Sequence, residues 1–284
     1  MKYLRLLRFQ DQYIQFGTAF AAGLYLNIRD WRIFYWAISS TCISITAFMV
    51  NELTDRKDVD IYSWNAIHIG KDVKFNNLVL TFIFVTLSLT GFYIAYLINL
   101  FWWGLTMYII GLSYSLKPIR LKGKFILDIL SQLAVWLIIP FLAPISLYTD
   151  LITTAPFILI FALIYWSICF PYQLADFTAD LKSGIRPTHV VLGMRNSLIF
   201  GAILAILGIY FYFKLNIYLN YPWSIVFLAL TCYLLYLYIK WLGLNKIANQ
   251  IKSMQKDILI IKPLTQLLVP YLVIWYSVII PIKY

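Results

Sequence analysis

Residues 33–60 read IFYWAISSTCISITAFMVNELTDRKDVD, a long uncharged run that ends in a cluster of acidic and basic side chains. The stretch Asp176-Phe-Thr-Ala-Asp180-Leu-Lys182 repeats the pattern of Asn51, Asp55 and Lys57, with every matched pair 125 positions apart. Residues i and i+4 of a helix lie on one face, so each stretch can present two oxygen ligands in one direction. We interpret the rest of the chain around these two acidic motifs.

The composition is that of a helical membrane protein. Hydrophobic residues make up 62% of the chain and charged residues only 12%, whereas soluble domains carry about 25% charged residues. Uncharged runs of about 20 residues, the length of a membrane-spanning helix, recur along the chain. We therefore predict an all-α, multi-pass membrane protein that forms a single domain over residues 1–284.

The apolar runs predict nine transmembrane helices. The uncharged stretch 75–116 is too long for one crossing and fits two, with a break near Asn99. The other predicted spans lie near residues 10–28, 33–51, 128–148, 153–175, 196–213, 221–241 and 263–282.

The basic residues support this helix count. With nine crossings, the N-terminus and the connections after the second, fourth, sixth and eighth helices share one side. That side carries 19 of the 23 Lys and Arg residues, and the positive-inside rule places it in the cytoplasm. The net charge of +11 therefore reflects topology, and we expect no nucleic-acid partner.

Both acidic motifs fall on this cytoplasmic side, after the second and the sixth predicted helix. The chain then consists of two parallel pseudo-repeats of four helices, followed by a ninth helix. Two halves related by an axis along the membrane normal would bring the motifs face to face.

Carboxylates and an amide at helical spacing, with no His or Cys beside them, are hard oxygen ligands of the kind that suits Mg²⁺. Acids for a metal and bases for the remaining charge are what a diphosphate requires, because the metal bridges its oxygens and stabilises the leaving group. Either motif alone would fit a solvated loop equally well, and the pair favours a site. The basic residues that would surround such an anion are Lys57, Lys117, Arg120, Lys122, Lys182 and Arg186.

The remaining titratable residues point to no second site. His68 and His189 have no partner at ligand spacing, and we assign no role to either. The three cysteines each lie within an apolar run and are expected to be small buried hydrophobic residues. Asp128 begins the fifth predicted helix and is expected to cap it, although a head group in the site would be within its reach.

These motifs resemble those of the UbiA superfamily of intramembrane prenyltransferases. Residues 51–59 are similar to the family's first motif, N-D-x-x-D-x-x-x-D, and Asp176–Gly193, with its Asp pair, a Gly and a final Leu-Gly, to the second. Between them, Tyr114-Ser-Leu-Lys-Pro-Ile-Arg-Leu-Lys122 resembles the family's Tyr-Ser-x-x-Pro-x-Arg-x-Lys loop. The nine-helix count agrees, so the resemblance covers nearly the whole chain.

The first motif departs from the family pattern at two positions. Glu52 stands in place of the first Asp, and the last Asp falls on Val59. In a continuing helix Asp58 lies at +7 from Asn51, about 20° from its direction. We therefore take Asp58 as the third acid of this motif.

The resemblance implies that a polyprenyl diphosphate releases its diphosphate and that an electron-rich acceptor, for which we favour an aromatic quinone precursor, attacks the allylic cation. The tail would lie in an apolar groove open to membrane lipid. The implied Mg²⁺ ligands are Asn51, Asp55, Asp58, Asp176 and Asp180, and the four Asp are the implied catalytic residues. The implied diphosphate-binding residues are Lys57, Tyr114, Lys117, Arg120, Lys122, Lys182 and Arg186, with Tyr114 as a hydrogen-bond donor.

Several alternatives stay open. The acceptor could instead be a glycerol-phosphate lipid, a haem, a chlorophyllide-type ring or a carotenoid, and phosphoribosyl transfer to a polyprenyl phosphate belongs to the same superfamily. A transporter or channel is the alternative of another class, but such proteins place charges near the bilayer midplane. Here the first motif begins where a predicted span ends, and the third to sixth helices carry no charge mid-span.

Overall fold

The computed structural model describes residues 3, 6–7, 12–58, 75–214 and 222–260, and these form helices and connecting turns without a β-strand. Two 3₁₀ turns, η2 (Leu121–Gly123) and η4 (Leu151–Thr154), and one π-helical turn, η3 (Ala134–Ile138), lie between or within the helices. Residues 247–260 form a further helix after α12. The α-helices are α2 (Tyr13–Leu26), α3 (Trp31–Asp58), α4 (Asn77–Leu97), α5 (Phe101–Ser115), α6 (Leu127–Leu133), α7 (Ile139–Ile145), α8 (Ala155–Ala175), α9 (Phe177–Ser183), α10 (Thr188–Leu192), α11 (Met194–Lys214) and α12 (Pro222–Leu242).

Helices occupy eight of the nine predicted spans, and the ninth, near 263–282, lies outside the described residues, so the count of nine stays a prediction. Among the described residues, five segments are long and apolar enough to cross a membrane, and the chain is an integral membrane protein. These segments are Trp31–Asp55, Asn77–Leu97, Leu127–Ile145, Leu151–Ala175 and Met194–Lys214. One boundary differs in a useful way: the second helix continues to Asp58 and carries its acidic motif on one unbroken helix.

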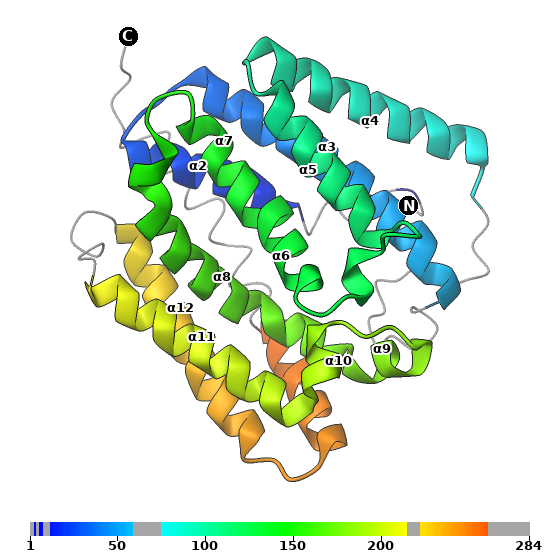
Figure 1. Cartoon of the computed structure of the whole chain (residues 1–284), viewed down its shortest axis with the longest axis vertical. Helices are drawn as coiled ribbons and strands as arrows, with labels where there is room; N and C mark the ends of the chain where they lie inside the picture. The colour runs from blue at the N-terminus through cyan, green and yellow to red at the C-terminus, as the bar shows by residue number, and fades with distance from the viewer. Residues whose placement is uncertain (1–2, 4–5, 8–11, 59–74, 215–221, 261–284) are drawn as a thin grey trace.

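The helices pack around two hydrophobic clusters that share α8. The first cluster joins α2, α3, α5 and α7 to the start of α8, where Phe157 and Phe161 belong to it. The second joins the rest of α8, including Trp166 and Phe170, to α11, α12 and the helix 247–260. Figure 1 shows α8 running between these two groups. Since α8 is apolar on all sides, it can be buried from both.

Close packing fixes the C-terminal half of α3. A Cβ atom on Gly111 of α5 would lie 2.8 Å from the Cβ atom of Ala47, so a larger residue there would push α5 away. Trp36 donates a hydrogen bond from Nε1 to the carbonyl oxygen of Pro140, at 3.0 Å, which ties α3 to α7. Through the close approach of Gly111 to Ala47, the acidic half of α3 is held against α5, on the right-hand side of Figure 1.

A polar cluster joins two turns at the opposite end of α3. Nη2 of Arg32 lies 2.8 Å from Oδ2 of Asp30, and the Arg32 guanidinium stands over the Tyr148 ring, 5.0 Å from its centroid. Burial raises the pKa of Asp30, but hydrogen bonds from Arg32 and Tyr148 outweigh it and lower that pKa below its usual value. Asp30 is thus ionised, and its pairing with Arg32, which stands over Tyr148, connects the start of α3 to the turn after α7.

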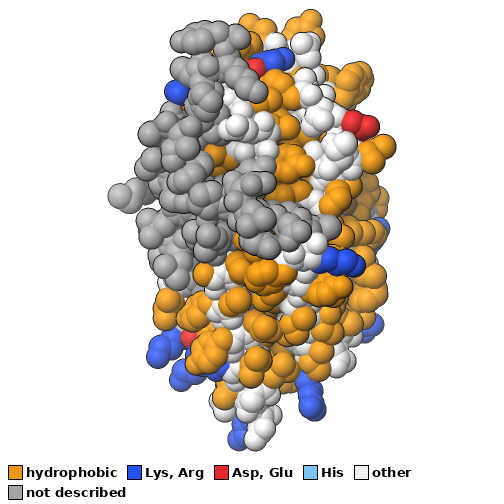
Figure 2. Space-filling model, turned by 90° about the vertical axis from the view of Figure 1, so that its left-hand side faces the viewer, with side chains coloured by type: hydrophobic (Ala, Val, Ile, Leu, Met, Phe, Trp, Pro, Cys, Tyr) orange, Lys and Arg blue, Asp and Glu red, His pale blue; other side chains and the backbone are white. Residues whose placement is uncertain are grey.

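The described surface is largely apolar. Figure 2 shows hydrophobic side chains over most of one face, with Lys and Arg mainly toward its lower end. On α4, Leu78, Phe82, Leu89 and Tyr93 are each at least 64% exposed. A continuous apolar surface of this kind suits contact with lipid rather than water.

Candidate functional site

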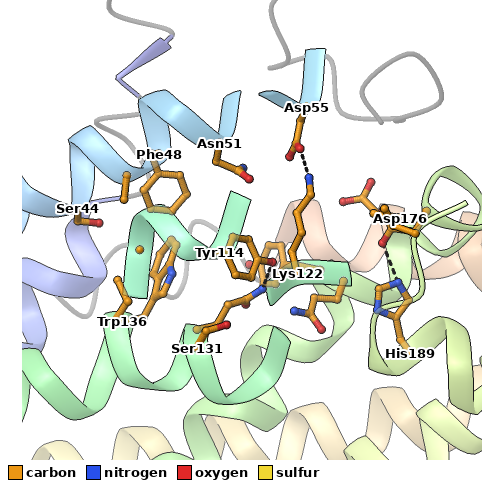
Figure 3. A pocket seen from close by; sticks show the side chains of 18 residues that line it. Ser44, Phe48, Asn51, Asp55, Tyr114, Lys122, Ser131, Trp136, Asp176 and His189 are labelled. Carbon is orange, nitrogen blue, oxygen red and sulfur yellow. Dashed lines mark hydrogen bonds and ion pairs between the residues drawn. The ribbon is translucent and has the colours of Figure 1, made fainter. Parts of the chain in front are cut away.

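A cavity of about 250 Å³ lies where the acidic end of α3 meets the junction of α8, α9 and α10. Asn51 and Asp55 reach it from α3, and Asp176 and Asp180 reach it from the other side. Figure 3 shows Asn51, Asp55 and Asp176 around the same space. The structure thus brings both acidic motifs to one cavity, as their spacing predicts.

The first motif lies on the unbroken helix α3. Asn51 accepts a hydrogen bond at Oδ1 from Oγ of Ser115, at 2.6 Å, and this bond ties the motif to the last residue of α5. Asp55 follows one helical turn later and is 9% exposed. α3 extends to Asp58, but the side chains of Lys57 and Asp58 lie outside those that the structure describes.

The second motif lies where α8 gives way to α9. Asp176 ends α8 and begins α9, with φ −92° and ψ 3°. The amide of Asp180 nevertheless donates to the carbonyl oxygen of Asp176 at 3.0 Å, so helical spacing continues across the junction. Gly184 closes α9 with a φ of +76°, a conformation that glycine adopts without strain.

Lys122 is the basic residue that the structure places inside the cavity. It lies on η2, is 6% exposed, and its Nζ pairs with Oδ1 of Asp55. Figure 3 shows its side chain extending between the two motifs. The sequence predicts Lys122 as a phosphate ligand, and here its partner is an acid of the first motif. Tyr114 also lines the cavity, where its hydroxyl accepts a hydrogen bond from Gln132.

The other predicted bases lie outside the described lining. Lys117, Lys182 and Arg186 are exposed and Arg120 is half-buried, and none of the four is among the described residues that line the cavity.

The residues present fit a Mg²⁺ ion that arrives with a phosphate group. Among the described residues, no three His, Cys, Asp or Glu side chains lie close enough to hold a metal by themselves. Magnesium, however, usually binds through one or two carboxylates and completes its shell with water and substrate phosphates. The Lys122 ammonium on Asp55 shows that the carboxylate of Asp55 already pairs with a cation in this cavity.

Asp128 does not line the described cavity and instead anchors α10 to the first turn of α6. Thr188 donates its hydroxyl to Oδ1 of Asp128, and its amide donates to Oδ2 at 3.0 Å. The Thr188 oxygen also accepts from the amide of Ile126 at 2.7 Å. Both Asp128 and Thr188 are buried, so this cluster fixes the next residue, His189, against the cavity.

His189 is a site residue that the sequence does not reveal. It is 2% exposed, lines the cavity, and places Nε2 3.0 Å from Oδ2 of Asp180. Its single signal is that it is a polar residue within the otherwise apolar run His-Val-Val-Leu. His189 lies nine positions after Asp180, and the fold of α9 and α10 brings the two together.

The end of the cavity away from the carboxylates is aromatic. The rings of Phe48 and Trp136 meet edge to face, with centroids 4.8 Å apart, and Figure 3 shows them opposite Asp176 and His189. Trp136 belongs to the π-helical turn η3, which, like many such turns, lies at the site. The cavity therefore has one charged end and one apolar end.

Solved structures resemble this chain over nearly its full length. A UbiA homolog from Archaeoglobus fulgidus bound to DMAPP and Mg²⁺ has a TM-score of 0.70 and 20% identity, over 98% of this chain and 100% of that one. The chain has the UbiA fold. The same homolog bound to GPP and Mg²⁺ has a TM-score of 0.69 and 18% identity, over 96% and 99%.

A digeranylgeranylglyceryl phosphate synthase shares the UbiA fold with this chain at a TM-score of 0.62 and 15% identity, over 99% and 98% of the two chains. The sequence matches no protein-family model and no curated protein. Identities of 15 to 20% leave few side chains in common, so the chemistry of this UbiA fold rests on the cavity itself.

Proposed function

We propose that the chain is a Mg²⁺-dependent prenyltransferase, which transfers a polyprenyl group from a polyprenyl diphosphate to an acceptor within the membrane. The observation that carries the proposal is the shared cavity: two acidic motifs 125 positions apart face one space beside a buried lysine. The UbiA homologs with this fold were solved with DMAPP or GPP and Mg²⁺, which are ligands of the class that such a cavity would hold.

In this proposal Asn51, Asp55, Asp176 and Asp180 hold the metal and, through it, the diphosphate. A metal held by these residues would supply positive charge against the charge that grows on the leaving diphosphate. The Lys122 ammonium can leave Asp55 and pair with a phosphate oxygen instead, because a phosphate held in the cavity would lie beside Asp55. The C–O bond then breaks with its electron pair leaving on the diphosphate, the acceptor attacks the allylic carbon, and the acceptor loses a proton.

The predicted outer bases complete this arrangement. Lys57, Lys117, Arg120, Lys182 and Arg186 raise the positive potential around the opening and attract the anionic head group. Asp58 would add a further acid, because a residue at +7 from Asn51 on the same helix lies about 20° from its direction. Tyr114, whose hydroxyl accepts from Gln132, still has its own proton to donate to a phosphate oxygen.

The apolar end of the cavity would receive the start of the isoprenoid tail. A buried protein cavity of about 150 Å³ takes up benzene, with its six carbons. The cavity here, at about 250 Å³, therefore accommodates on the order of ten atoms of that size. The diphosphate takes part of this space, so Phe48 and Trp136 would contact the first isoprene units, and a longer tail would continue into the groove toward lipid.

We propose an aromatic acceptor of the quinone-precursor type. Phe48, Trp136 and Tyr172 provide aromatic surface in the lining, with uncharged polar groups of Gln132 and Gln173 beside them. A glycerol-phosphate acceptor would bring a second phosphate, yet Lys122 is the lone Lys or Arg among the described lining residues. An acceptor with little charge therefore suits this cavity better.

We also propose that the cavity faces the cytoplasm, since the predicted connections on that side carry 19 of the 23 basic residues. A cysteine at exposed Lys182, introduced after the three native cysteines are replaced by serine and labelled with a membrane-impermeant maleimide, tests this orientation. Labelling should occur in inside-out vesicles and be absent from right-side-out vesicles.

The experiment for the activity uses membranes or purified protein with a radiolabelled prenyl diphosphate and a panel of aromatic acceptors. Diphosphate release and a lipid-soluble labelled product should require Mg²⁺ and disappear with EDTA. Asp55→Asn and Asp180→Asn should each reduce turnover by at least a hundredfold, because each loses a charged ligand while keeping the shape of the side chain.

The matched control is Asp150→Asn. Asp150 is exposed and caps η4 through a hydrogen bond to the amide of Ile152, which an Asn can also accept. Its substitution should leave turnover within twofold. Product formation that survives both cavity substitutions, or that proceeds in EDTA, would contradict the proposal, and metal-dependent solute flux without prenyl turnover would favour a transporter.

A further inference from the structure

His189 is the side chain that contacts the Asp180 carboxylate. Nε2 of the imidazole lies 3.0 Å from Oδ2 of Asp180, and the dashed line from His189 in Figure 3 marks this contact. Among the described residues, the Asp180 carboxylate makes no other ion pair or hydrogen bond. The carboxylate has a second oxygen, Oδ1, that this contact leaves available to another ligand.

The imidazole is itself held in place from several directions. Thr188, the preceding residue, is bonded through its hydroxyl and its amide to buried Asp128. The His189 carbonyl oxygen accepts from Oγ of Ser197 at 3.0 Å. The His189 ring also packs beside that of Phe177, with centroids 6.2 Å apart. With 2% of its surface exposed, His189 has little room to change its orientation.

A buried imidazole in a membrane protein is costly unless it serves a purpose, because its nitrogens lose their hydrogen bonds to water. Neither ring nitrogen makes a hydrogen bond among the described residues, and the polar contact of the imidazole is the approach of Nε2 to the Asp180 carboxylate at ion-pair distance. The benefit lies at Nε2, which fixes one oxygen of a carboxylate that faces the cavity. Groups that orient a ligating carboxylate typically contribute tenfold to a hundredfold to metal affinity.

We propose that His189 is a positioning residue that holds Oδ2 of Asp180 so that Oδ1 points to the divalent metal of the diphosphate site. This inference rests on the proposed function, because it takes Asp180 as a metal ligand. It accounts for a buried histidine after the two acids, which the spacing of metal ligands in the sequence does not predict. It also assigns the function of the Thr188 anchor, which is to keep the imidazole in register with the carboxylate.

The test measures binding of Mn²⁺, a paramagnetic substitute for Mg²⁺, to the purified full-length protein in detergent. Inorganic diphosphate is present throughout. The loss of the free Mn²⁺ signal in electron paramagnetic resonance gives the dissociation constant without any turnover. We expect His189→Ala to raise that constant about tenfold or more. Its folding is checked in parallel by thermal unfolding.

Two conservative variants make the test specific for the nitrogen involved. The amide nitrogen of a Gln can occupy the place of Nε2, whereas that of an Asn can reach only the place of Nδ1. His189→Gln should therefore restore Mn²⁺ affinity to within about threefold of wild type, and His189→Asn should bind as weakly as His189→Ala. A purely structural histidine would shift the unfolding temperature of all three variants without this order in affinity.

The outcomes separate the inference from the proposed function. Unchanged Mn²⁺ affinity in His189→Ala, or equal rescue by Gln and Asn, overturns the positioning role, while Mg²⁺-dependent prenyl turnover by the wild type would leave the proposed function standing. If wild-type protein neither binds Mn²⁺ nor turns over prenyl diphosphates, both fall. If turnover in His189→Ala recovers at high Mg²⁺, with kcat restored and only the Mg²⁺ requirement raised, the positioning role is supported.

Discussion

Thr188→Val tests the anchor that positions the second acidic motif. The substitution keeps the shape of the side chain and removes its oxygen, so the donor to Asp128 and the acceptor for the Ile126 amide are lost together. Ile126 has a φ of +66°, which is unfavourable for a β-branched residue. Its amide therefore loses a hydrogen bond at a point where the backbone is already strained.

The expected loss of stability follows from these two bonds. A hydrogen bond to a charged group contributes about 1.5–3 kcal/mol, and leaving a buried amide unsatisfied costs about 1–3 kcal/mol. The bond from the Thr188 amide to Asp128 remains, so we expect a net loss of about 3 kcal/mol. At about 2–4 °C for each kcal/mol, the unfolding temperature should fall by about 6–12 °C.

Tryptophan fluorescence during heating of the purified protein in detergent measures this change. Thr188→Ser is the control. It keeps the hydroxyl, so its fall in unfolding temperature should be less than about a third of that for Thr188→Val. In an Asp128→Ala background the part of the cost that comes from the Thr188–Asp128 bond should vanish, and the part that comes from the Ile126 amide should remain. An unfolding temperature for Thr188→Val within 2 °C of wild type would refute the reasoning.

Three further substitutions probe the packing and the two ends of the cavity. Gly201→Ala should destabilise the protein by about 1–3 kcal/mol, because the new Cβ would lie 2.5 Å from the Tyr238 ring, and thermal unfolding measures this. Trp136→Ala should open the apolar end of the cavity and raise the relative turnover of prenyl diphosphates with longer tails, measured by competition between chain lengths. Lys122→Met should lower stability by about 3 kcal/mol by leaving Asp55 buried without its cation, and added Mg²⁺ should raise its unfolding temperature more than that of wild type.

Each of these has a control on the same chain. Gly123→Ala should be neutral, because its Cβ would meet Ile185 at an ordinary 3.9 Å. Trp102→Ala removes a tryptophan that is 74% exposed and should not alter the preference for tail length. Lys246→Met removes an exposed lysine outside the described lining and should leave the response to Mg²⁺ unchanged. A control that behaves like its partner variant would contradict the corresponding prediction.

The membrane-spanning architecture and the helix face that each motif presents are both determined locally by the sequence. Uncharged runs such as 33–51 can satisfy their backbone only as helices in lipid, so their positions appear directly in the composition. Asn51 and Asp55, or Asp176 and Asp180, share a helix face through a spacing of four residues. The repetition of that spacing 125 positions later is by itself enough to predict a common site.

The tertiary structure decided which side chains complete that site. Lys122 and Lys117 belong to the same short loop, yet one is buried on Asp55 and the other is exposed. That difference depends on how η2 packs against α5 and α6. His189 contacts Asp180 beside a bond that joins Thr188 to Asp128 across 60 residues of sequence. Periodicity reports the face of a single helix, whereas contacts between separate helices depend on packing that no local pattern records.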